Sequence, residues 1–169
     1  SGDPEIKLGL LDSLLMNIGQ TCCDILSRFL FEQQVFERVQ NENLRSEDLQ
    51  TIMHEAQVES YGDGLDAESL HPYMWACKGH YYSAGRNYYN FPYAYGALFS
   101  KGLYAKYLEE GASFKEKYDQ MLTNTTVASC EDIGKMVDVD VSSKEFWAKS
   151  LKMIEDMIDD FIKLSSEEE

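Results

Sequence analysis

Apolar residues recur along the first part of the chain at the spacing expected for one face of a helix. Seven of them are separated by three, four or seven positions: Leu11, Leu15, Ile18, Cys22, Ile25, Phe29 and Phe36. Asp3 followed by Pro4 is typical of a helix start. The pattern predicts one helix of nearly forty residues, about 55 Å long at 1.5 Å per residue, packed in an antiparallel bundle.

The rest of the chain shows further helical patterns, separated by glycine, proline and polar turns. The predicted helices are Ser46 to Tyr61, Phe91 to Glu110, Phe114 to Leu122, Glu131 to Val137 and Ser143 to Leu164. Gly96 and Gly102 lie inside one of them, where glycine costs about 1 kcal/mol relative to alanine, so we expect another helix to pack closely there. With no credible series of strands, we predict an all-α helical bundle forming a single domain over residues 1–164, followed by an acidic tail at 165–169.

One aromatic segment, His71 to Gly96, interrupts this regular pattern. It contains two of the three histidines, one of the two tryptophans and seven of the eleven tyrosines. A buried phenol without a partner costs about 1–3 kcal/mol, so this many tyrosines suggest a surface that is partly in water. Two interpretations are open: an aromatic layer between helices with tyrosines at its rim, or the wall of a binding site.

Charge and composition exclude some classes of function. The net charge of −15 argues against binding to nucleic acid or to an anionic membrane, because both require basic residues. No apolar run approaches the roughly 18 residues of a membrane span, and we expect a cytoplasmic protein. The four cysteines form no CxxC pair and are interpreted as reduced packing residues. The chain starts Ser-Gly-Asp-Pro without methionine, which indicates residues added for expression, a cut inside a longer protein, or processing.

A short string resembles a metal-binding motif but lacks a ligand. His54 and Glu55 begin the string His-Glu-Ala-Gln-Val, in which Val58 stands where a zinc-protease helix needs its second histidine. The carboxylates of the last predicted helix are interpreted as a solvated face rather than a metal cluster. We therefore predict no complete metal site in this chain.

The segments SRFLFEQQVFERVQ, from Ser27 to Gln40, and YGDGLDAESLHPYMWACKGHYYSAGRNYYNFPYAYGALFSKGLYAKYLEEG, from Tyr61 to Gly111, carry a family resemblance. They resemble the C-terminal part of the oligoendopeptidase F group of zinc metallopeptidases, relatives of thimet oligopeptidase. The similarity extends over nearly the whole chain. It implies the C-terminal portion of a larger, two-lobed, all-helical peptidase that encloses a deep channel and hydrolyses short peptides inside cells.

The resemblance also implies that the catalytic metal lies elsewhere. In that family two histidines of an HExxH helix and a glutamate of the next helix hold zinc, and all three precede the part matched here. We therefore expect zinc in the parent protein, an N-terminal lobe that is missing here, and no catalysis by this chain alone. Loss of that lobe exposes apolar surface, so self-association of the fragment is expected.

The resemblance further suggests which residues face the substrate. His80 matches a family histidine near the zinc, and Tyr82 and Tyr89 are the first candidates for catalytic tyrosines, with Tyr81, Tyr88 and Tyr93 as substrate-binding residues. A phenol or imidazole N–H aimed at a tetrahedral oxyanion stabilises it by about 2.7–4 kcal/mol in known cases. Two alternatives remain from the residues alone: a non-catalytic helical module that binds peptides, and a helical interaction protein whose aromatics form a core.

Overall fold

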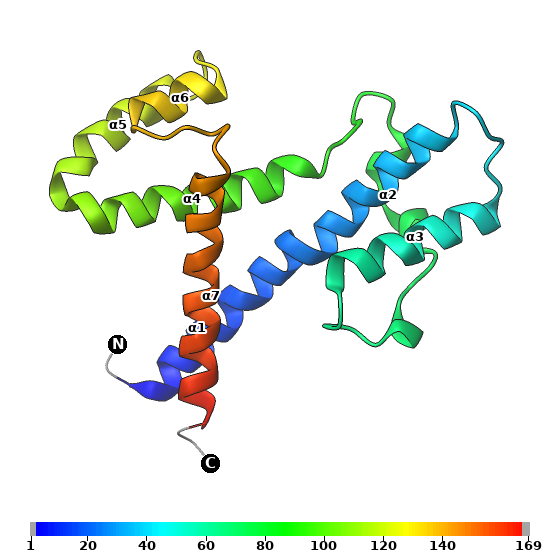
Figure 1. Ribbon diagram of the computed structural model, residues 1–169, viewed down its shortest axis with the longest axis horizontal. Coiled ribbons are helices and arrows are strands. Elements are labelled where there is room, and N and C mark those ends of the chain that lie inside the picture. Colours follow the sequence, from blue (N-terminus) through cyan, green and yellow to red (C-terminus); the bar gives the residue numbers. More distant parts are fainter. Residues whose placement is uncertain (1–2, 167–169) are drawn as a thin grey trace. The chain divides into compact units, whose positions relative to one another are not determined.

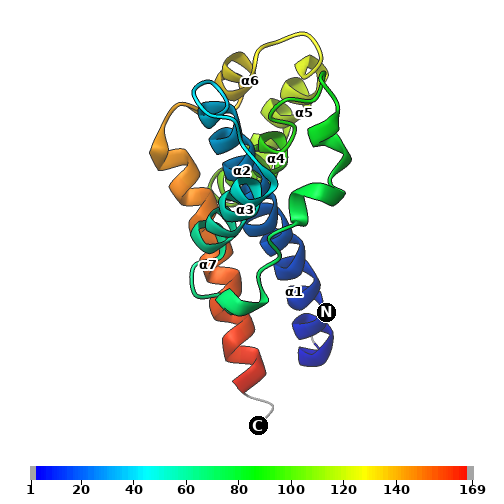
Figure 2. The same ribbon diagram turned by 90° about the vertical axis from the view of Figure 1, so that its right-hand side faces the viewer.

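The computed structural model describes residues 3–166 and confirms the predicted all-α fold, with no strand in that range (Figures 1 and 2). The described residues divide into two compact units. Residues 3–15 and 96–166 form one unit, and Met16–Tyr95 form the other. The prediction of a single domain over residues 1–164 stays a prediction.

The predicted long N-terminal helix forms, but with a wider turn in its middle. It consists of α1 (Pro4–Gly19), the π-helical turn η1 (Gln20–Asp24) and α2 (Ile25–Arg38). At the start of α1 the backbone N–H of Glu5 donates to Asp3 Oδ1 at 3.1 Å, as expected for a helix cap. A π turn holds more residues per turn than an α turn, so it rotates the following side chains out of the register assumed for α1.

The predicted apolar stripe is therefore only partly buried. Ile25 is buried, whereas Phe36 at the end of the stripe is exposed and Phe31 and Glu32 are buried instead. α1 contributes no buried residue. Leu11, Leu15 and Ile18 of the stripe are half-buried, so the prediction is wrong only at Phe36, which follows the π turn that the single α-helical period did not include.

The unit Met16–Tyr95 is built on two antiparallel helices, α2 and α3 (Ser46–Tyr61), which lie side by side in Figure 1. Its buried apolar residues come from both helices: Phe31, Ile52, Met53 and Ala56. After Gly62 the chain forms only short 3-10 turns: η2 (Ala67–Ser69), η3 (Met74–Cys77) and η4 (Gly79–Tyr82). Buried Gln57 anchors this stretch, donating to the carbonyl of His71 at 3.0 Å and accepting its N–H at 3.1 Å.

The other unit contains most of α4 (Phe91–Glu110), then η5 (Gly111–Ser113), α5 (Phe114–Asn124), α6 (Cys130–Met136) and α7 (Lys144–Ser166). Its core is a cluster of buried apolar side chains: Leu103, Phe114, Met121, Ile133, Val137, Val139 and Phe146. Figure 1 shows α7 crossing α4. At that crossing a Cβ on Gly102 would lie 2.3 Å from Phe146, so the close approach predicted there is confirmed.

Another sequence prediction about this unit is wrong. A Cβ on Gly96 would meet no atom within 4 Å, so close packing does not explain that glycine. The acidic tail predicted at 165–169 stays a prediction; α7 continues through Ser166, and the hydroxyls of Ser165 and Ser166 donate to the carbonyl of Ile162. Residues 167–169 of the predicted tail lie outside the described residues.

Candidate functional site

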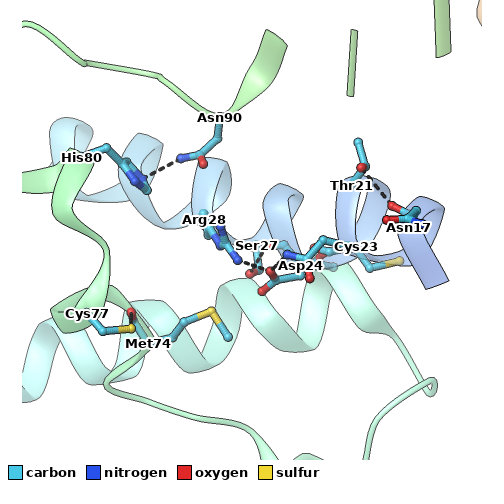
Figure 3. Close-up of polar contacts among 12 residues, drawn as sticks. Asn17, Thr21, Cys23, Asp24, Ser27, Arg28, Met74, Cys77, His80 and Asn90 are labelled. Atoms are coloured by element: carbon cyan, nitrogen blue, oxygen red, sulfur yellow. Dashed lines mark hydrogen bonds and ion pairs between the residues drawn. The ribbon is translucent and has the colours of Figure 1, made fainter. Parts of the chain in front are cut away.

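His80 lies in η4 and is held by Asn90, the residue that precedes α4 (Figure 3). The amide nitrogen Nδ2 of Asn90 lies 3.0 Å from His80 Nε2. An amide nitrogen can only donate, so Nε2 accepts and a neutral ring carries its proton on Nδ1. Asn90 is 1 % exposed, so the bond that orients the imidazole is shielded from water while the ring itself is half-buried.

The electrostatic surroundings of His80 favour this neutral form. Burial lowers the pKa of His80, and the positive charges of Arg28, Lys78 and Arg86 lower it further. Arg28 forms an ion pair with Asp24 one turn earlier, shown in Figure 3 on the helix beneath His80. At neutral pH the imidazole is therefore an uncharged hydrogen-bond donor through Nδ1.

Two tyrosines extend the group around His80. The ring of Tyr89 lies 5.5 Å from the His80 ring between centroids, and its hydroxyl lies 2.7 Å from the hydroxyl of Tyr93. Tyr89 and Tyr93 are 41 % and 45 % exposed, so both phenols reach water. Their mutual hydrogen bond raises the pKa of Tyr93, with a smaller contribution from burial. We call His80, Tyr89 and Tyr93 the donor cluster.

The other predicted tyrosines lie differently. Tyr82 is 65 % exposed and donates to the carbonyl of Ala76 at 3.2 Å. Tyr81 packs its ring 5.2 Å from that of Phe31 and donates to the carbonyl of Arg28 at 2.8 Å. Burial raises the pKa of this phenol far above its ordinary value. Tyr81 thus holds the aromatic segment against α2, whereas Tyr82 presents its ring to solvent.

Tyr88 is also bound to α2, through its backbone. It has a φ of +53°, a left-handed conformation that is uncommon for tyrosine. Its N–H donates to Glu32 Oε1 at 2.8 Å, and its ring lies 5.6 Å from that of Phe29 and 5.4 Å from that of Phe36. These contacts fix the backbone immediately before Tyr89 and Asn90.

Glu32 is therefore a further residue of the site, and the sequence did not identify it. It is 5 % exposed, and its second oxygen, Oε2, is buried without a hydrogen-bond partner. Burial raises the pKa of this carboxyl, while the N–H of Tyr88 lowers it to a lesser extent. A carboxylate inside a predicted apolar helix face was a usable signal, because such a residue is rarely buried without a specific contact.

A shallow hollow of about 510 Å³ lies beside the donor cluster. Its lining comes from one continuous stretch: Gly85, Arg86, Asn87, Tyr88, Tyr89, Phe91, Pro92 and Tyr93. The guanidinium carbon of Arg86 lies 5.8 Å from the centre of the Tyr89 ring. The site therefore combines neutral donors, aromatic faces and one cation.

The structure brings together no metal-ligand group within residues 3–166, where no three His, Cys, Asp or Glu side chains converge. His54 lies half-buried on α3, and Cys23, Cys77 and Cys130 form no disulfide among the described residues. The described residues therefore do not fit zinc on their own. Within the same range no helix has the length and apolar character needed to cross a membrane.

Comparison with known proteins adds no relative: no protein-family model, curated protein or solved structure matches this chain. The resemblance drawn from the sequence rests on the quoted segments, and the geometry described above is read from this chain itself.

Proposed function

We propose that this chain is the substrate-facing C-terminal portion of an intracellular zinc oligopeptidase that hydrolyses short peptides. The observation that carries the proposal is the donor cluster, in which an oriented neutral imidazole and two exposed phenols lie together beside a hollow. Peptide hydrolysis passes through a tetrahedral oxyanion, and fixed uncharged donors stabilise such a charge without having to lose a proton of their own.

The role of each residue follows from its exposure and partners. Tyr89 and Tyr93 donate to carbonyl oxygens of the bound peptide, since both residues reach water and, within residues 3–166, each hydroxyl has the other as its hydrogen-bond partner. Asn90 keeps His80 in the tautomer with its proton on Nδ1. Tyr82 offers an exposed ring against a peptide side chain. Zinc, when bound by the N-terminal lobe of the parent protein, supplies a Lewis acid and an activated water.

The test uses the longer parent protein. We expect stoichiometric zinc and peptide hydrolysis that a chelator abolishes. His80→Ala and Tyr89→Phe should each lower kcat by about 10²–10³-fold with zinc content unchanged, the loss expected for one oxyanion donor. Tyr107→Phe removes an equally exposed phenol far along the chain and should leave kcat within twofold.

Two results would refute the proposal: a parent protein without zinc-dependent hydrolysis, or donor variants that hydrolyse as fast as Tyr107→Phe. A protein that binds short peptides at this surface but never cleaves them would instead be the non-catalytic peptide-binding module that the sequence left open.

A further inference from the structure

We propose that the hollow lined by residues 85–93 binds a carboxylate of the peptide, with the C-terminal carboxylate as its natural ligand. This inference rests on the proposed function and specifies which part of the substrate this surface recognises. Arg86 is the only charged residue that lines the hollow. A guanidinium presents two parallel N–H donors that match the two oxygens of a carboxylate.

Arg86 is held in a defined place beside the donor cluster. Its guanidinium lies over the face of Tyr89, and its backbone N–H donates to the carbonyl of Ser83 at 2.9 Å. Stacking on an aromatic ring limits the freedom of a long side chain and leaves its N–H edge available to a ligand. The Tyr89 ring therefore lies near both the Arg86 cation and the His80 ring.

The local charge is opposite to that of the whole chain. The chain has 30 acidic and 15 basic residues, yet all three charges that act on His80 are positive. Arg28 is paired with Asp24, and the buried Glu32 is bonded to the N–H of Tyr88. Arg86 and Lys78 have no acidic side chain within ion-pair distance among the described residues, so their charge is available to an anion.

Recognition of a chain end suits the hollow. It is shallow and lies directly beside the two exposed phenols, so a carboxylate on Arg86 leaves the preceding peptide groups within reach of Tyr89 and Tyr93. Phe91 and Pro92 add apolar contact for the last side chain. Every unmodified peptide carries one C-terminal carboxylate, whatever its sequence.

The experiment measures binding of labelled pentapeptides to the 169-residue chain by fluorescence anisotropy. One peptide has a free C-terminal carboxylate, a second has the same sequence with a C-terminal amide, and a third is amidated but carries a penultimate aspartate. We expect the free acid to bind about tenfold more tightly than the amide, with the aspartate peptide close to the amide. Arg86→Gln should remove this preference, while Lys115→Gln, an exposed cation with the same change in net charge, should preserve it.

Equal binding of the free acid and the amide, or a preference that survives Arg86→Gln, overturns the inference. So does binding of the aspartate peptide as tightly as the free acid, because the ligand is then any carboxylate rather than the chain end. Failure of this inference is distinguishable from failure of the proposed function: zinc-dependent hydrolysis by the parent protein that does not discriminate acids from amides refutes only the carboxylate site.

Discussion

Glu32 offers the sharpest test of how α2 positions the site. Its Oε1 accepts the N–H of Tyr88 across 56 positions of sequence, and its Oε2 is buried without a partner. Two variants separate these features. Glu32→Gln keeps an acceptor of the same shape and removes the charge, whereas Glu32→Ala removes the acceptor as well.

The expected loss of stability follows from the backbone N–H of Tyr88, which loses its hydrogen-bond partner in Glu32→Ala. Leaving a buried donor unsatisfied costs about 1–3 kcal/mol, so Glu32→Ala should unfold more easily than Glu32→Gln by that amount. The left-handed backbone of Tyr88 adds to the effect, because a sparsely populated conformation persists only while its surroundings enforce it. In Glu32→Ala we therefore also expect the hydrogen bond between Asn90 and His80 to be formed less of the time.

The titration of the Glu32 carboxyl makes the stability of the folded chain depend on pH, and the direction of that dependence can be predicted. Burial raises the pKa of Glu32 above its ordinary value of 4.5, so the folded state holds the proton more tightly than the unfolded state. Stability of the wild type therefore falls as pH rises from that ordinary value through the raised pKa. Glu32→Gln has no such proton, so its stability relative to the wild type should increase over the same interval and then stay constant.

Urea unfolding at several pH values between 5 and 8, followed by tyrosine fluorescence, measures both effects. Glu37→Gln is the matched control, since it removes an exposed carboxylate from the same helix and should change the free energy of unfolding by less than about 0.5 kcal/mol. If Glu32→Ala and Glu32→Gln unfold at the same urea concentration, or if the Gln variant loses stability relative to the wild type as pH rises, the role assigned to Glu32 is wrong.

Two further predictions concern other contacts. Gly102→Ala should destabilise the chain by about 1–3 kcal/mol, because its Cβ would overlap Phe146. Gly96→Ala on the same helix meets open space and should stabilise the chain by about 0.5–1 kcal/mol. Thermal unfolding of both variants tests this, and equal changes in melting temperature would contradict it. Tyr89→Phe should lower the pKa of Tyr93 toward its ordinary value, because it removes the hydrogen bond between the two hydroxyls. NMR titration of the Tyr93 ring carbon measures this pKa, and an unchanged pKa would refute the hydrogen bond.

The helices were largely predictable because each depends on local signals. The capping side chain of Asp3 and the positive φ of Gly111 at the end of α4 both act within a few residues. The π turn at residues 20–24 was not predictable, because spacing alone does not reveal one extra residue in a turn. For the same reason the sequence could not show which apolar residues of the long helix face the core.

The site residues suggested by the sequence stay a prediction, and the contacts that hold them could not be predicted. The family resemblance, not the composition of the segment, suggested His80 and Tyr89, and their rings lie 5.5 Å apart between centroids. Asn90 and Glu32, which fix the imidazole and the backbone of Tyr88, were missed because each acts on a residue brought near only by folding. The position of Glu32 on a predicted apolar face was a signal of burial, but the partner of neither residue could be identified from one sequence.

The burial of the tyrosines separates those that the fold needs from those available for function. The phenol of Tyr81 donates to a backbone carbonyl of α2, so losing that hydroxyl removes about 0.5–1.5 kcal/mol of stability. The phenols of Tyr89 and Tyr93 bond to each other at the surface, where water can replace either one at little cost. Stability therefore does not require a hydroxyl at these two positions. Because phenylalanine would pack there as well, Tyr89→Phe and Tyr93→Phe separate the proposed contact with a ligand from any effect on stability.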